Sequence, residues 1–135
     1  MEFLKKMKIV CIKPQRIMTK QDAFNKVWNH FIKNKKGPSI SKNGQCEYYN
    51  NDTGKKCAIG VLLPKSVCVE ICNNVISIAR HEIPEKYREP FFSDILFWST
   101  LQMTHDQAAA GSRPFKPKMK ECLQKFAKEW KLEIP

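Results

Sequence analysis

The sequence has 135 residues, a length typical of one domain and sufficient for a hydrophobic core that needs no metal or disulfide. Hydrophobic residues make up 42% and aromatic residues 10%, which excludes the polar composition of disordered chains. Lys and Arg number 24 against 13 Asp and Glu, a formal charge of +11, so we expect a surface that attracts polyanions. The alternative is that the surplus lysine serves only solubility. Lysine far exceeds arginine, which disfavours sequence-specific reading of DNA bases.

The six cysteines are an even number, so a disulfide framework must be weighed first. The basic start of the chain is followed by an apolar run of only residues 9–12, too short for the core of a signal peptide. No later stretch has the length of a membrane span. We therefore expect a cytoplasmic protein without membrane contact, with its thiols reduced. The cysteines are Cys11, Cys46, Cys57, Cys68, Cys72 and Cys122.

Residues 1–17 are interpreted as a basic N-terminal arm, and residues 18–135 as a single helical domain. The first helix is predicted after Thr19, because Asp22 three residues later completes a capping box before an apolar stripe at helical spacing. The basic turn and Gly-Pro pair within residues 34–38 should end this helix.

Residues 39–56 are rich in Ser, Asn, Gly and Asp, which predicts a β-hairpin with a strand at 45–49 and a turn at 50–54. Residues 57–63 are apolar throughout and should be buried, as a strand or a short helix. A short helix is expected over 66–72, with Cys68 and Cys72 facing inward. One or two helical turns should follow at 83–88, with Pro84 near their start.

Two strong helices complete the predicted fold. Ser93 should cap a helix that runs to about residue 110 and is closed by Gly111. The last helix starts near residues 116–117 and has the cleanest amphipathic pattern in the chain. We therefore expect a mainly α fold, a compact bundle of roughly four helices with a β-hairpin insertion.

Cys57 and His105 are the candidate catalytic pair of a thiol-dependent enzyme, since a cysteine at a helix start is activated by the positive end of that helix. Asp106 is not expected to orient His105, because neighbouring helical residues point about 100° apart. A second alternative is a metal-stabilised module with Cys46, Cys57 and His105 as ligands. The chain lacks the closely paired cysteines of most zinc sites, so we expect no metal or other cofactor. The plainer interpretation places these side chains in the core.

The surplus positive charge gathers at both ends of the chain. Six basic residues and one acidic residue fall within the first 20 positions, and seven basic and two acidic residues within 112–131. Aromatic residues such as Trp130 and Phe115 lie close enough in sequence to stack with bases. The candidate anion-binding residues are Arg113, Lys116, Lys118, Lys120, Lys125, Lys128 and Lys131, together with Lys55 and Lys56.

Three motifs together resemble a family of small, uncharacterised proteins of bacteriophages and bacteria. They are Gly44-x-Cys46-x-Tyr48, Cys57-Ala58-Ile59-Gly60 and Leu101-Gln102-x-x-His105-Asp106. The resemblance covers residues 18–135 and implies a phage or mobile-element context, with action in the host cytosol. Small accessory proteins in that context bind host machinery, including defence systems and their nucleotide signals. With the charge, this predicts a non-enzymatic accessory protein that binds nucleic acid, a nucleotide signal or a host protein.

Overall fold

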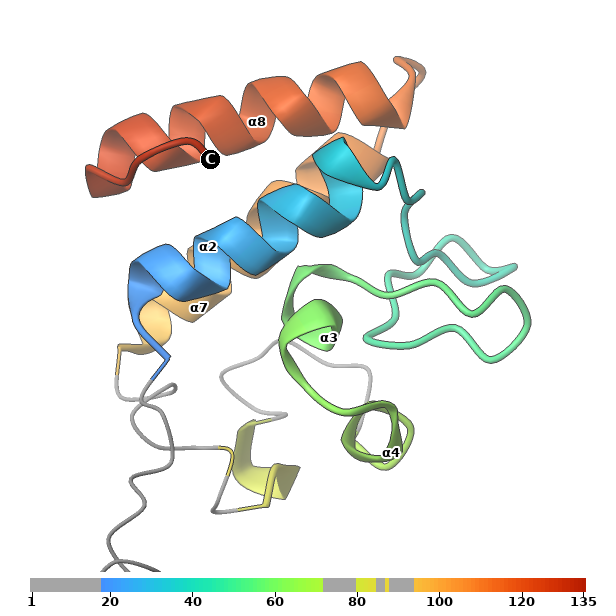
Figure 1. Ribbon diagram of the computed structural model, residues 1–135. Helices are drawn as coiled ribbons and strands as arrows, with labels where there is room; N and C mark the ends of the chain where they lie inside the picture. Colours follow the sequence, from blue (N-terminus) through green and yellow to red (C-terminus); the bar gives the residue numbers. More distant parts are fainter. Residues whose placement is uncertain (1–17, 72–79, 85–86, 88–93) are drawn as a thin grey trace, which may run out of the picture.

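The computed structural model describes residues 18–71, 80–84, 87 and 94–135, and within them the fold is mainly α (Figure 1). The predictions for the arm at 1–17 and for Cys72 lie outside the described residues. Three longer helices dominate: α2 (Lys20–Trp28), α7 (Ile95–Ala109) and α8 (Phe115–Trp130). Among the described residues, no helix combines the length and hydrophobicity that crossing a membrane requires.

Helix α2 begins with the predicted capping box. The Asp22 backbone N–H donates to Thr19 Oγ1 at 3.0 Å, and the Thr19 N–H donates to the Asp22 carboxylate at 3.3 Å. The helix continues into one π-helical segment, η1 (Asn29–Lys33), in which the Asn34 N–H bonds to the carbonyl of Asn29 five residues earlier. The helical pattern and its start are confirmed.

Helix α8 packs on both other long helices through aromatic side chains. Its Phe126 ring stacks on Phe24 of α2 at 6.0 Å between centroids, and meets Phe97 of α7 edge to face at 5.4 Å. The predicted inward stripe is confirmed, because Met119, Leu123 and Phe126 are buried. The predicted cap of helix α7 at Ser93 is wrong, because the N-cap is Asp94, whose carboxylate accepts the Phe97 N–H at 3.3 Å. Gly111 beyond the end of the helix adopts a φ of +87°.

The segment between η1 and α3 (Ala58–Leu62), drawn cyan to green, extends beside the long helices (Figure 1). No strand forms in the described residues, so the strand predicted at 45–49 is wrong. The hairpin reduces to two isolated antiparallel bridges, Ile40 with Cys46 and Tyr49 with Lys56. Polar side chains bond neighbouring backbone N–H groups here, as Ser41 Oγ does with Gln45, which favours turns over a ladder.

The apolar segment 57–63 is resolved as the short helix α3, followed by α4 (Lys65–Cys68). Gly60 in α3 lies against the backbone of the preceding turn. A Cβ atom at this position would approach the Tyr48 carbonyl oxygen to 1.9 Å, well inside contact distance. Only glycine therefore allows α3 to pack this closely on Tyr48. The 3₁₀ segment η2 (Arg80–Glu82) comes directly before residues 83–88, where one or two helical turns were predicted. Of that predicted range, the structure describes only residues 83, 84 and 87.

Candidate functional site

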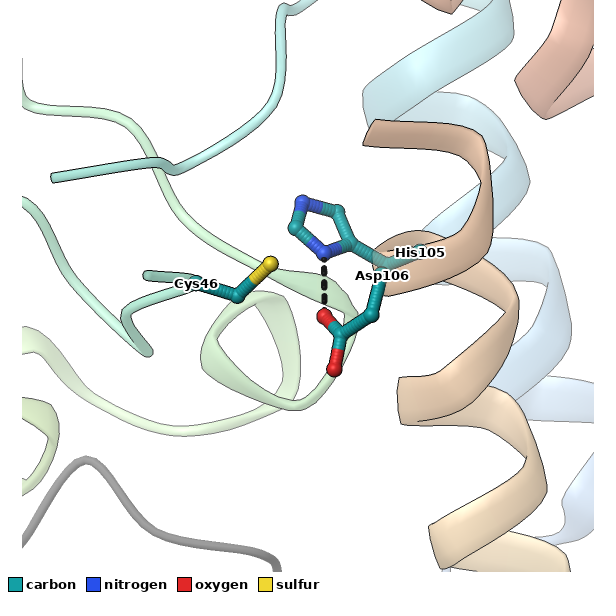
Figure 2. Close-up of side chains that lie close together, drawn as sticks. All are labelled: Cys46, His105 and Asp106. Atoms are coloured by element: carbon teal, nitrogen blue, oxygen red, sulfur yellow. Dashed lines mark hydrogen bonds and ion pairs between the residues drawn. The ribbon is translucent and has the colours of Figure 1, made fainter. Parts of the chain in front are cut away.

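Cys46, His105 and Asp106 form one polar cluster at the side of α7 (Figure 2). The sulfur, an imidazole nitrogen and a carboxylate oxygen all lie within 4.8 Å of one another. His105 and Asp106 come from α7, and Cys46 comes from the bridge with Ile40. Figure 2 shows the Cys46 sulfur directed toward the other two side chains. Residues 60 positions apart in sequence thus meet at one point.

The prediction that Asp106 cannot orient His105 is wrong, because His105 Nδ1 lies 2.9 Å from Asp106 Oδ1. The 100° offset describes only the directions of the Cα–Cβ bonds of neighbouring residues. Nδ1 is the ring nitrogen nearer the backbone, and the Asp106 side chain turns so that its carboxylate reaches this nitrogen. On the other edge of the ring, Nε2 accepts the Ser39 backbone N–H at 3.3 Å. This bonding pattern assigns the ring proton to Nδ1. The nitrogen beside Cys46 thus already carries a proton and is not placed to accept one from the thiol.

Neither cysteine of the predicted chemistry is an activated thiol. Burial, together with a hydrogen bond to the Asp106 carboxylate and its negative charge, raises the pKa of Cys46 to about 12. Cys57 is fully buried at the start of α3, and burial raises its pKa well above the usual range. Its sulfur accepts the Gly60 N–H at 3.4 Å and lies outside the three-residue cluster. The pair Cys57 and His105 therefore lacks the thiolate character of a nucleophile.

Neighbouring residues hold the cluster in place. The Gln102 amide donates to Asp106 Oδ1 at 3.0 Å, while its oxygen accepts the Ile59 N–H at 3.1 Å. The fully buried His105 ring packs on Phe31 and Phe115, with centroids 5.5 and 5.8 Å away. The cluster is therefore supported from α3, η1 and α8 as well as from α7.

A second feature is a basic pocket, which we define by His30, Lys36, Lys55 and Lys56. It has a volume of about 290 Å³. Its other lining residues are Gly37, Thr53, Gly54 and Val61, so no carboxylate lines it. Lys55 and Lys56 were predicted as anion-binding residues, and the structure brings them together with two residues that the sequence did not indicate. Among the described residues, no ion pair involves these three lysines.

The buried side chain of Asn50 shapes the turn that presents Lys55 and Lys56. Its oxygen accepts the N–H groups of Asp52 (2.9 Å) and Thr53 (3.3 Å), and its amide donates to the Ile40 carbonyl at 2.9 Å. The turn predicted at 50–54 is therefore confirmed, and Gly54 within it has a φ of +72°. The ammonium of Lys55 lies 2.8 Å from where a Cβ on Gly37 would stand, so the Lys55 side chain packs against Gly37.

The pocket carries concentrated positive charge. The pKa of His30 falls from 6.5 to about 4, first because the ring is half-buried and then because Lys56, Lys36 and His105 lie near it. His30 Nε2 is inaccessible to solvent and has no hydrogen-bond partner within the part of the chain that the structure describes. The three lysines, which no carboxylate in the lining compensates, favour an anionic ligand in the pocket.

The predicted basic face of α8 is less uniform. Arg113 is paired with Glu121 at 2.9 Å, and the Lys118 ammonium donates to the Ala110 carbonyl at 2.6 Å. The remaining five predicted lysines are exposed along α8 and at its end: Lys116, Lys120, Lys125, Lys128 and Lys131. They form a charged helix face, whereas only Lys55 and Lys56 of the predicted set line the basic pocket.

No family model, no curated protein and no solved structure matches the chain. The resemblance to small phage proteins therefore stays a prediction from the motifs. The four cysteines that the structure describes are free thiols: Cys46, Cys57, Cys68 and Cys122.

Proposed function

We propose that this chain is a non-enzymatic binding protein whose basic pocket takes a phosphate-bearing ligand, either a nucleotide or the backbone of a nucleic acid. The supporting observation is the convergence of three lysines and the half-buried His30 on one pocket that no carboxylate lines. A bound anion would offset the charges of these lysines, which no acidic side chain in the lining does.

The size of the pocket favours a small anionic group. At about 290 Å³ it lies at the lower end of ligand sites, which span roughly 300–1,000 Å³. It therefore suits a phosphate with part of a nucleoside better than a bulky ligand. Lysine ammonium groups act as point charges and do not read base edges as arginine does, so binding should depend weakly on base sequence.

Two further features shape the proposal. The exposed lysines of α8 add a long-range field that raises the rate of encounter with polyanions without defining a site. The motif resemblance supplies the context, a phage-type accessory protein acting on the nucleic acids, nucleotide signals or nucleic-acid-handling and defence proteins of a host. The competing ligand class is an acidic surface of a host protein. The binding experiment separates this class from nucleotides and nucleic acid.

The experiment compares two doubly substituted variants that lose the same charge. Lys55→Gln with Lys56→Gln alters the basic pocket, and Lys125→Gln with Lys128→Gln alters the exposed face of α8. Binding is measured with a short oligothymidylate by fluorescence anisotropy and with ATP by calorimetry. With about three phosphate contacts, affinity for the single strand should fall roughly 20-fold between 50 and 200 mM salt.

We expect the pocket variant to lose about tenfold or more in affinity, equivalent to about 1.4 kcal/mol, and the α8 variant to lose less than about threefold. Binding of ATP as well as the oligonucleotide identifies a nucleotide ligand, whereas binding of the oligonucleotide alone identifies a nucleic acid. Equal losses in both variants, or no binding to either probe, would contradict the proposal.

A further inference from the structure

We propose that Cys46, His105 and Asp106 form a zinc site whose fourth position is open to solvent. Thiolate, imidazole and carboxylate are the three side-chain ligand types of protein zinc, and sites with three protein ligands keep a position for water or another ligand. None of these three residues lines the basic pocket, although His105 lies near His30, and the proposal does not depend on anion binding there.

The geometry requires only small movements. Zinc bonds of about 2.0–2.3 Å place the ligand atoms of a tetrahedral site roughly 3.3–3.6 Å apart. In the cluster all three candidate atoms already lie within 4.8 Å of one another. The closest pair, His105 Nδ1 and Asp106 Oδ1 at 2.9 Å, must separate by a few tenths of an ångström. Rotation of side chains supplies such a change without a shift of α7.

The charges also balance. A Cys46 thiolate and the Asp106 carboxylate together offset the two positive charges of Zn²⁺, so the filled site is neutral. On binding, the S–H bond of Cys46 breaks, its proton passes to solvent and a sulfur–zinc bond forms, with no change of oxidation state. Asp106 has 42% of its side chain exposed and Cys46 is only partly buried, so water has access to the fourth position.

Ser39 provides an independent observation that points to a ligand. With zinc on Nδ1, the His105 proton moves to Nε2, so this nitrogen gives up the hydrogen bond that it accepts from the Ser39 backbone N–H and needs an acceptor instead. Ser39 touches that edge of the ring through its backbone N–H at 3.3 Å. Its own hydroxyl oxygen is buried and has no hydrogen-bond partner in the described part of the chain. We infer that this hydroxyl becomes the acceptor in the zinc-bound form, which explains a buried polar atom that is otherwise unpaired.

Other neighbours complete an outer shell around the ligands. The Gln102 amide orients the Asp106 carboxylate at 3.0 Å, and aromatic rings fix the plane of His105. This ligand set differs from the one predicted by sequence, because Asp106 takes the place of Cys57. The Cys57 sulfur instead accepts the Gly60 N–H and caps α3.

The test uses the full chain, freed of metal with a chelator and then titrated with Zn²⁺ or Co²⁺ alone. Native mass spectrometry should show one zinc per chain, and Co²⁺ should give a thiolate charge-transfer band. Cys46→Ser should abolish that band and weaken zinc binding at least about tenfold. Cys122→Ser, which removes a partly buried thiol on α8, is the matched control and should leave both unchanged. A band that survives Cys46→Ser, or no stoichiometric zinc, would overturn the proposal.

Ser39→Ala separates metal binding from a merely structural role. Because its hydroxyl is unpaired in the metal-free protein, the substitution should leave metal-free stability unchanged within about 0.5 kcal/mol. It should still weaken zinc binding about tenfold. Unchanged zinc affinity would refute the role given to Ser39.

If Cys46→Ser does not fold, alkylation of the wild-type chain tests the site instead. Zinc should then protect Cys46 from alkylation, and equal labelling with and without zinc would overturn the site.

Discussion

His30 should couple anion binding to proton uptake, so that binding tightens as the pH falls. In the free protein, partial burial and the nearby Lys56, Lys36 and His105 hold the pKa of His30 at about 4. A phosphodiester in the basic pocket offsets the lysine charges but not the burial of the ring, and so raises the pKa part of the way toward its ordinary value of 6.5. The complex then carries the proton at a pH where the free protein does not, so affinity rises as the pH falls through 6.5.

The size of this effect follows from the two pKa values. Full restoration of the His30 pKa from about 4 to 6.5 sets the upper limit, at which affinity at pH 5 exceeds that at pH 7.5 by roughly 30-fold. The same difference lowers stability in acid, because the unfolded chain takes up the proton first. The free energy of unfolding should therefore decline between pH 6.5 and 4 by at most about 3 kcal/mol.

An unphosphorylated oligothymidylate is the appropriate ligand, because its phosphodiesters keep their charge across this range, whereas a terminal phosphate gains a proton near pH 6. Anisotropy titrations of wild type and His30→Gln give the affinities, and NMR of the imidazole protons gives the pKa of His30 with and without ligand. A parallel pH profile in His30→Gln, or a His30 pKa that saturation with ligand leaves unchanged, would refute the coupling.

Three substitutions test the packing and capping of the fold. Gly60→Ala forces a methyl group against the Tyr48 carbonyl and should cost about 1–3 kcal/mol in urea unfolding; a change below about 0.5 kcal/mol would show that the contact is relaxed in solution. Thr19→Ala removes the cap of α2 and should cost about 1 kcal/mol, with an unchanged melting temperature as the contrary result. Phe97→Ala empties a fully buried position against Phe126 and should cost about 3–5 kcal/mol by the same urea assay; a loss under 1 kcal/mol would contradict the core described here.

Helices with local signals were predictable from the sequence. The capping box at Thr19 and the apolar stripe of α8 depend on residues three and four apart in sequence, so these patterns predict a helix without knowledge of tertiary contacts. The predicted strand at 45–49 failed because turn formation here depends on particular side-chain bonds. The Asn50 amide donates to the Ile40 carbonyl, ten residues away, and the sequence pattern does not predict that contact.

The candidate sites were only half predictable, for a similar reason. Composition indicated that Lys55 and Lys56 bind anions, but His30 lies in a π-helical segment, where a spacing of 3.6 residues per turn no longer indicates which way a side chain faces. Lys36 was interpreted only as part of the basic turn that ends the first helix. Asp106 was rejected as a partner of His105 because neighbouring residues of a helix point about 100° apart. The contact with His105 depends instead on the conformation of the Asp106 side chain.

The central claim, that the basic pocket holds the anion, is tested most directly by mapping amide chemical shifts during titration with a nucleotide. We predict that the largest changes fall on the amides of Gly37, Gly54 and Lys56, and that the His30 ring signals move with them. Changes confined to the exposed lysine face of α8, or no saturable change anywhere, would contradict the account.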